Sequence, residues 1–203
     1  MKRNRTIGGL VVAIVILSSA LAAPVAAKGA KQQVGPRVTI EGAKLPEGGE
    51  DIGTSDDPAI GKPAPTLTGE GFDGKPVTFE SGAPRIVIFL SHSCPHCQAE
   101  VPRIVKLEKQ EKFDGVEVQT VTTNTSEDAP NYPPSKWLKR ERWPFKPVLA
   151  DDKRARALTA FGGTSFPYLV FVSADGIGEI DVATGFRTKA HRIDLVGLCR
   201  RCS

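Results

Sequence analysis

Residues 85–111 read RIVIFLSHSCPHCQAEVPRIVKLEKQE and contain a Cys-x-x-Cys pair between two contrasting patterns. The first six residues are almost all β-branched, aliphatic or aromatic, which indicates a strand buried in a sheet. Apolar residues then recur at helical spacing and predict an amphipathic helix over 98–111. Cys94 and Cys97 therefore lie where a buried strand ends and a helix begins.

Cys94 is expected at the start of this helix, with Pro95 at the first helical position, where no amide hydrogen is needed. The free amides of the first turn and the positive end of the helix dipole then point toward the Cys94 sulfur and stabilise its thiolate. Cys97 follows one turn later on the same face, so its thiol can resolve a mixed disulfide. The pattern predicts a redox pair in which Cys94 attacks and Cys97 resolves.

Three other uses of the cysteine pair fit the sequence less well. A structural disulfide across so short a loop would constrain the unfolded chain by only about 2 kcal/mol. A zinc site needs two more ligands, and the remaining cysteines, Cys199 and Cys202, lie about a hundred residues away. Haem attachment requires a histidine directly after the second cysteine, and Gln98 and Ser203 occupy those positions.

The chain has 203 residues, of which 40% are hydrophobic and 25% charged, so one globular domain with extensions is expected. Basic residues precede an uncharged run over 7–23, which is typical of a cleaved export signal or a membrane anchor within 1–27. Either form would place the domain outside the cytoplasm, in the cell envelope, where disulfides form and persist. The protein is thus expected to be secreted or membrane-tethered.

The net charge bears on possible partners. Cleavage after residue 27 would remove three basic residues and no acidic ones, lowering the formal net charge from +4 to +1. The one dense basic stretch, 136–142, is better explained as the solvated face of a short helix. We therefore expect no nucleic-acid partner.

Residues 28–58 are poor in large apolar residues and rich in glycine and proline, which predicts a flexible linker before a domain at 59–203. Strands alternate with helices in that domain, followed by a hairpin and a terminal helix, which indicates a three-layer α/β fold. The expected elements are a hairpin over 66–79, strands at 85–90, 116–121, 147–150, 168–172 and 179–182 with a turn at 175–176, and helices at 98–111, 134–142, 152–161 and 189–198.

An ordered set of motifs matches one known family. The set comprises Gly61-Lys62-Pro63-Ala64-Pro65, the Asp73-Gly74 turn before Val77, the segment from Cys94 to Pro102, Phe166-Pro167-Tyr168, and Ala174-Asp175-Gly176. Together these motifs resemble the TlpA/ResA-like branch of the thioredoxin family over roughly residues 59–198. The resemblance implies a thioredoxin-like α/β/α fold with an added N-terminal β-hairpin, and thiol–disulfide exchange outside the cytosol.

The resemblance also implies roles for individual residues. Cys94 corresponds to the attacking cysteine and Cys97 to the resolving one. Pro167 corresponds to a proline held cis beside the active-site disulfide, which would present the Phe166 backbone to a bound substrate chain. Glu100 corresponds to an acidic residue that influences cysteine ionisation, although a solvated helix position explains it equally well.

Some positions depart from the family pattern. Ser93 stands where relatives often carry tryptophan, and Ile88 stands where thioredoxin carries a buried aspartate. The Pro95-His96 dipeptide is the one found in DsbA, and a protonated His96 would favour the thiolate and make the disulfide more oxidising. Because the family resemblance suggests a reductase instead, the direction of exchange stays open.

His92 raises an alternative function, a copper or haem-assembly thiol carrier. Together with Cys94, Cys97 or His96 it could bind a metal ion. A polar residue at the rim of the active site is the favoured interpretation, because Met1 is the only methionine and the spacing typical of metal capture is missing.

A thiol peroxidase is a further, less favoured alternative. A peroxiredoxin-like site would have Ser or Thr three residues before the reactive cysteine and proline seven residues before it. Ser91 fits the first requirement, but Val87 does not fit the second.

Cys199 and Cys202 form a second pair close to the C-terminus, flanked by arginines. This pair could form a terminal disulfide, exchange with Cys94–Cys97 as a relay, or cross-link to another chain. The terminal disulfide is the favoured interpretation. We further expect a monomer without cofactor or metal that exchanges disulfides with exported proteins and with a membrane or extracytoplasmic redox partner.

Overall fold

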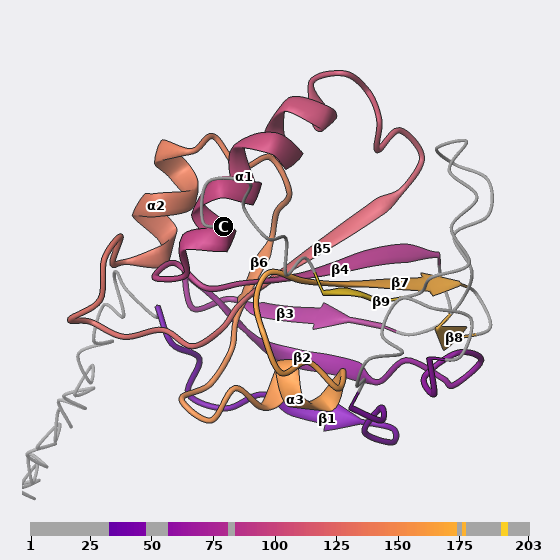
Figure 1. The fold of residues 1–203 in the computed structure, drawn as a ribbon. Coiled ribbons are helices and arrows are strands. Elements are labelled where there is room, and N and C mark those ends of the chain that lie inside the picture. The colour runs from indigo at the N-terminus through magenta and orange to yellow at the C-terminus, as the bar shows by residue number, and fades with distance from the viewer. Residues whose placement is uncertain (1–32, 48–56, 81–83, 174–175, 178–191, 195–203) are drawn as a thin grey trace, which may run out of the picture.

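A computed structural model of the protein describes residues 33–47, 57–80, 84–173, 176–177 and 192–194. Within these residues, nine strands form one mixed sheet with three helices packed on it (Figure 1). The helices are α1 (Pro95–Glu108), α2 (Pro134–Arg140) and α3 (Arg156–Ala160). The strands are β1 (Thr39–Glu41), β2 (Thr66–Gly71), β3 (Pro76–Phe79), β4 (Arg85–Leu90), β5 (Glu117–Thr122), β6 (Val148–Ala150), β7 (Tyr168–Ser173), β8 (Gly176–Ile177) and β9 (Arg192–Asp194).

The strand order is β1-β2-β6-β5-β4-β7-β8, with β3 paired to β2 and β9 paired to β7. The central strand β4 is buried along its whole length, as its apolar sequence predicts. It pairs in parallel with β5, which pairs in parallel with β6, whereas β7 runs antiparallel to β4. The carboxyl ends of β4, β5 and β6 therefore share one edge of the sheet, opposite the β7 arrowhead in Figure 1.

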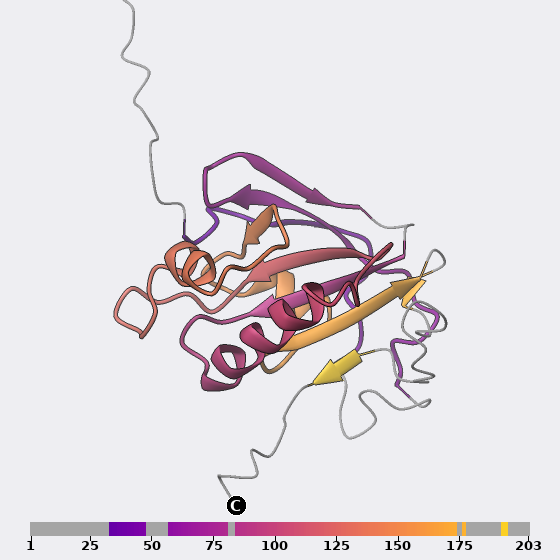
Figure 2. The same cartoon turned by 90° about the horizontal axis from the view of Figure 1, so that it is seen from above.

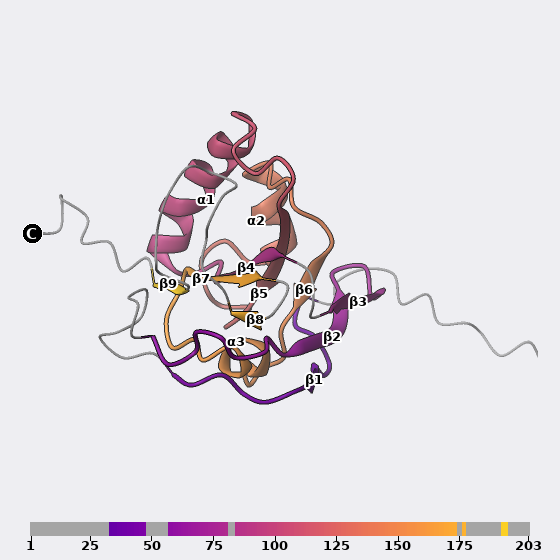
Figure 3. The same cartoon turned by 90° about the vertical axis from the view of Figure 1, so that its right-hand side faces the viewer.

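The helices cover both faces of the sheet. Helices α1 and α2 lie on one face and α3 on the other (Figure 3), and α1 runs lengthwise along the strands (Figure 2). Because successive side chains of a strand point to opposite faces, β4 contributes to both cores. Ile86, Ile88 and Leu90 pack with α1 and α2, whereas Val87 and Phe89 pack with α3. The predicted three-layer, thioredoxin-like α/β/α fold is confirmed.

The predicted hairpin before β4 is also present. Strands β2 and β3 pair antiparallel, with Thr68 opposite Thr78. The turn between them contains Gly74 at a φ of +75°, a conformation that glycine adopts without strain. Because β2 also pairs antiparallel with β6, the hairpin extends the main sheet.

The prediction of a flexible linker over 28–58 was wrong for residues 33–47. This segment contains β1, which pairs antiparallel with β2 and places Ile40 opposite Leu67. Val38 and Leu45 are buried in the core on the α3 side, with exposed fractions of 0% and 2%. A three-residue strand with isolated apolar neighbours has no measurable periodicity, so the pairing with β2 could not be read from the local sequence.

The C-terminal predictions need two corrections. Residues 192–194, expected within a helix over 189–198, form β9 and pair antiparallel with β7. Gly176, expected in a turn, begins β8, which pairs with the end of β7. The free edge of β7 offers backbone hydrogen bonds along its length, and this pairing overrides local helical spacing. Helix α3 also begins at Arg156 instead of residue 152.

Several predictions fall on residues outside the described ranges. They concern the signal or anchor at 1–27, the strand at 179–182, and the second cysteine pair, Cys199 and Cys202. Within the described ranges, the helices are too short or too polar to cross a membrane.

Candidate active site

The Cys-x-x-Cys pair lies at the junction of β4 and α1, as the sequence predicts. Cys94 is the N-cap of α1, Pro95 occupies the first helical position, and the helix continues for 14 residues. The helix therefore begins where Pro95 predicts, and it ends at Glu108, three residues before the end expected from the apolar pattern over 98–111. The junction places Cys94 at the edge of the sheet where three parallel strands end.

The two thiols occupy unlike environments. Cys94 is partly exposed, whereas Cys97 is fully buried among the apolar residues of α1 and β4. The Ser91 amide donates a hydrogen bond to the Cys97 sulfur at 3.3 Å. Burial raises the pKa of the Cys97 thiol far above its usual value, and this hydrogen bond only partly opposes the effect. Cys97 is therefore protonated at neutral pH, and both cysteines are free thiols in this structure.

A distant loop completes the site beside Cys94. The Phe166–Pro167 peptide bond is cis, as the family resemblance implies. The Cys94 thiol donates to the Phe166 carbonyl oxygen at 3.5 Å, across 72 positions of the sequence. The pairing of β7 with β4 accounts for this contact, because Phe166 lies two positions before the start of β7. The roles of Pro167 and Phe166 in substrate binding stay predictions.

The other predicted site residues lie on the first turns of α1. His96 is exposed, and among the described residues no hydrogen bond joins it to either sulfur. Glu100 accepts a hydrogen bond from the exposed Arg103 guanidinium at 3.1 Å. The Glu100 side chain is only 18% exposed, so the ion pair does not decide between the two interpretations of this residue. Influence of His96 or Glu100 on the cysteines stays a prediction.

His92 is a structural residue whose role the sequence did not reveal. Its Nδ1 lies 2.7 Å from the Pro130 carbonyl oxygen, and its Nε2 lies 3.2 Å from the Ser126 amide nitrogen. A carbonyl only accepts and an amide only donates, so the ring is neutral with its proton on Nδ1. Because both ring nitrogens are engaged within the fold, His92 has no free lone pair for a metal ion. The interpretation of His92 as a metal ligand is therefore not supported.

The backbone of His92 also anchors neighbouring segments. Its carbonyl oxygen accepts hydrogen bonds from the Gln98 side chain at 3.0 Å and from the Asn131 side chain at 3.3 Å. Arg140 on α2 in turn donates to the Asn131 side chain at 2.7 Å. The loop before Cys94 is thus held by α1, by the loop after β5 and by α2. A histidine two residues after the largely apolar strand β4 was the only sequence signal for this network.

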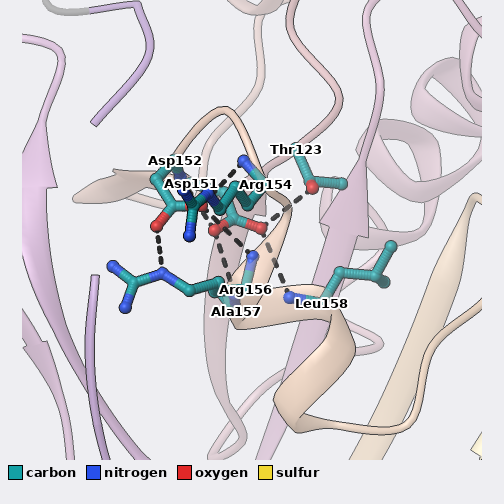
Figure 4. A network of polar contacts seen from close by, with 7 residues as sticks. All are labelled: Thr123, Asp151, Asp152, Arg154, Arg156, Ala157 and Leu158. Atoms are coloured by element: carbon teal, nitrogen blue, oxygen red, sulfur yellow. Dashed lines mark hydrogen bonds and ion pairs between the residues drawn. The ribbon is translucent and has the colours of Figure 1, made fainter. Parts of the chain in front are cut away.

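A second buried polar network lies at the end of β6 (Figure 4). The Asp151 carboxylate accepts hydrogen bonds from the Thr123 hydroxyl at 2.9 Å and from the amides of Asp152, Ala157 and Leu158 at 2.8, 3.0 and 3.3 Å. Burial raises the pKa of the Asp151 carboxyl, and the hydrogen bonds oppose that rise. The network fixes the first turn of α3 to the ends of β5 and β6.

Comparisons with known proteins place the chain in a family. The model of the AhpC/TSA family matches residues 60–177, more than half of the chain. A comparison with curated proteins finds no match.

Three solved structures illustrate the likeness in fold. The thioredoxin domain of a thiol-disulfide oxidoreductase from Bacteroides vulgatus is 23% identical, with a TM-score of 0.47 over 58% of this chain and 84% of that one. StoA from Bacillus subtilis is 19% identical, with a TM-score of 0.44 over 55% and 81%. A thioredoxin-family thiol:disulfide interchange protein from Chlorobium tepidum is 26% identical, with a TM-score of 0.44 over 66% and 91%. On the family match over residues 60–177, the chain belongs to the AhpC/TSA family.

Proposed function

We propose that the protein is a thiol–disulfide oxidoreductase in which Cys94 attacks and Cys97 resolves. The observation that carries this proposal is the asymmetry of the pair at the start of α1. Cys94 is partly exposed at the N-cap, where first-turn amides favour a thiolate, whereas Cys97 is buried one turn behind it. A substrate disulfide can therefore react directly with Cys94, whereas Cys97 reacts only with the mixed disulfide that forms at Cys94.

In the reducing direction, the Cys94 thiolate attacks one sulfur of a substrate disulfide, and the other substrate sulfur leaves as a thiolate. Cys97 then loses its proton and attacks the Cys94 sulfur, which releases the substrate as a dithiol. The cysteine pair is oxidised by two electrons and the substrate disulfide is reduced by two. The oxidising direction reverses each step with the same residues.

The resolving step needs a proton acceptor because burial raises the pKa of Cys97. Ile88, fully buried in the cluster that contains Cys97, occupies the position where thioredoxin carries an aspartate. The thiolate that leaves the substrate in the first step can take up this proton, directly or through water, while the Cys97 sulfur forms its bond to Cys94, so that a free Cys97 thiolate need not form first. We propose that the substrate itself removes the Cys97 proton.

We also propose that the protein belongs to the TlpA/ResA-like branch and acts in the cell envelope on exported proteins, together with a redox partner there. The motif around Cys94 and the Phe166-Pro167-Tyr168 motif support the branch, and the basic start with the uncharged run over 7–23 supports export. Alkaline carbonate washing and mass spectrometry of the N-terminus test the location. Residues 1–27 retained in the membrane pellet would show a tether. A new N-terminus at Lys28 would show a secreted form. An intact chain in the cytosol would contradict export.

The two alternative functions are less well supported. The copper-carrier alternative relied on His92 as a metal ligand, but both ring nitrogens of His92 are hydrogen-bonded within the fold. A peroxidase would have proline at position 87. Val87 stands there instead, and its side chain packs in the core between the sheet and α3. The Ser91 hydroxyl lies 3.2 Å from the Ser93 hydroxyl, so it is engaged within its own loop.

Reduction of insulin and refolding of scrambled hirudin test the activity in both directions. Cys94→Ser should abolish exchange, while Cys97→Ser should accumulate a mixed disulfide with the substrate. Ser93→Ala, which changes a neighbouring residue but neither thiol, serves as the matched control and should keep activity. Full activity of Cys94→Ser would overturn the assignment.

A further inference from the structure

A cavity of about 540 Å³ lies between the segment before β1 and the turn before α3. Four of its lining residues are cationic and one is acidic. The lining residues are Val34, Gly35, Pro36, Arg37, Asp152, Lys153, Arg154 and Arg156. The proposed exchange mechanism does not use any of these residues.

Specific contacts hold both walls of the cavity. On one wall, the Gly35 amide donates to the Asp151 carbonyl oxygen at 3.0 Å. A Cβ at Gly35 would lie 2.2 Å from the Ala150 carbonyl oxygen, so only glycine lets this segment lie against β6. On the other wall, the Asp152 carboxylate accepts from the amide of Arg154 at 2.9 Å and pairs with the guanidinium of Arg156 (Figure 4).

The charge of the cavity is unbalanced. Its single carboxylate, Asp152, is engaged with Arg156 and with backbone amides. Among the described residues, none of the salt bridges involves Arg37, Lys153 or Arg154, and all three side chains are exposed. The cavity therefore carries a net charge of about +3, which attracts anions. The sequence did not reveal it, because Arg37 lies far along the chain from the other cations.

Asp152, on one wall of the cavity, lies two residues after the end of β6, at the edge of the sheet that carries Cys94. The backbone ladder continues past the strands at this edge, with Thr123 N–H donating to Leu90 O and Asp151 N–H donating to Thr122 O, both at 2.9 Å. Adjacent strands lie about 4.8 Å apart, so β6 is about 10 Å from β4 across the sheet. About three extended residues cover that span. One polypeptide can therefore reach Cys94 and the cavity together.

We propose that this cavity binds an acidic segment of the polypeptide whose cysteine reacts with Cys94. The inference rests on the proposed function and adds a substrate preference to it. Carboxylate side chains a few residues from the reactive cysteine would pair with Arg37, Lys153 and Arg154. Because these cations are exposed, the attraction raises the rate of encounter and is screened by salt.

Two peptide disulfides test the preference. One carries four aspartates beginning about three residues from its cysteine, a spacing that matches the span between strands. The other carries asparagines at the same positions. Each exposed charge pair contributes roughly a factor of two, so kcat/KM should be about tenfold higher for the acidic peptide at low ionic strength. About 0.5 M salt should remove most of the difference.

The variant Arg37→Gln/Lys153→Gln/Arg154→Gln should lose the preference while keeping kcat/KM for the neutral peptide. The matched control is Lys106→Gln/Lys109→Gln/Lys112→Gln, which removes the same charge at the far end of α1, where all three side chains are exposed. The control should keep the preference. Equal kcat/KM for the two peptides in the unmodified protein, or equal losses in the two triple variants, would overturn the inference.

A binding measurement separates this inference from the proposed activity. In a Cys94→Ser background, fluorescence anisotropy with alkylated peptides reports binding without any exchange. Tighter binding of the acidic peptide that is lost only in the cavity variant supports the cavity, even if no peptide is ever turned over. Exchange of both peptides without charge-dependent binding would refute the cavity and leave the oxidoreductase intact.

Discussion

Two helices, α1 and α3, begin at the same edge of the sheet, but their first-turn amides have different hydrogen-bond partners. At the β6–α3 junction, the buried Asp151 carboxylate accepts hydrogen bonds from the Ala157 and Leu158 amides in the first turn. At the β4–α1 junction, the N-cap is Cys94, and within this described helix no side chain caps the first turn. The first-turn amides of α1 thus stay available to a thiolate that exists only when Cys94 ionises.

The difference shows how one arrangement serves two purposes. A buried carboxyl group hydrogen-bonded to the start of a short helix ties that helix to the sheet and stabilises the fold. A partly exposed sulfur at the start of a long helix leaves the same kind of stabilisation for a reactive group. Variants at the two junctions should therefore affect different properties, stability at Asp151 and reactivity at Cys94.

The largest expected effect on stability follows Asp151→Ala. The change leaves a buried hydroxyl and three buried amides without their acceptor, so unfolding should become easier by about 3 kcal/mol or more. Urea denaturation measures this change. Asp114→Ala removes an exposed aspartate and should leave the midpoint unchanged. Equal midpoints for the two variants would contradict the structural role of Asp151.

A slightly smaller loss is expected for His92→Ala. The ring is fully buried and makes two hydrogen bonds to the loop after β5, so its removal should cost about 2 to 4 kcal/mol. The matched control is His96→Ala, four residues later and exposed, which should not change stability. If the two histidine variants unfold at the same urea concentration, the His92 network is not important for the fold.

Asp151 and its neighbour Asp152 should show opposite pH dependence. Burial raises the pKa of Asp151, so the folded protein binds more protons than the unfolded chain between the two pKa values, and the contribution of Asp151 to stability falls as pH rises through that range. Burial also raises the pKa of Asp152, but hydrogen bonds from the Arg156 side chain and from the Arg154 and Arg156 amides outweigh it, and the net pKa is lowered. Its stabilising contribution is present above the unfolded pKa and is lost as pH falls.

Urea denaturation between about pH 3 and pH 7 tests this contrast through the variants Asp151→Asn and Asp152→Asn. The stability difference between the unmodified protein and Asp151→Asn should decrease with rising pH. The corresponding difference for Asp152→Asn should increase. Slopes of the same sign would show that the two carboxylates are not in different environments.

The smallest expected effect concerns His96→Leu at the start of α1. A positive charge on the exposed His96 ring would favour the Cys94 thiolate, so its loss should slow iodoacetamide labelling of Cys94 about two- to fivefold near pH 6. The Cys94–Cys97 disulfide should also become harder to reduce. Unchanged labelling and potential would mean that the helix amides act on Cys94 without help from His96.

Local sequence patterns correctly predicted those elements of the fold that depend on residues close together in the sequence. The apolar run of β4, the proline after Cys94 and the turn at Gly74 each correspond to the observed element. Strand β1 and strand β9 were missed because each is three residues long and depends on pairing with a distant strand. The periodicity of a short segment does not indicate which distant strand it pairs with.

The polar part of the site was predicted least well. The two cysteines form a recognisable motif, and the family resemblance gave the cis Pro167. The His92 and Asp151 networks join residues from separate loops, and Arg37 meets Lys153 only because the chain before β1 folds back onto β6. These contacts follow from the tertiary arrangement, which no single stretch of sequence specifies.

The most direct test of the central claim is the relative reactivity of the two thiols in the native, fully reduced protein. Cys97 is fully buried with a raised pKa, whereas Cys94 is partly exposed at the start of α1. A brief pulse of iodoacetamide at pH 7, followed by peptide mass spectrometry, should modify Cys94 at least about tenfold faster than Cys97, and urea should abolish the difference. Labelling of Cys97 as fast as Cys94 in the folded protein would contradict the account.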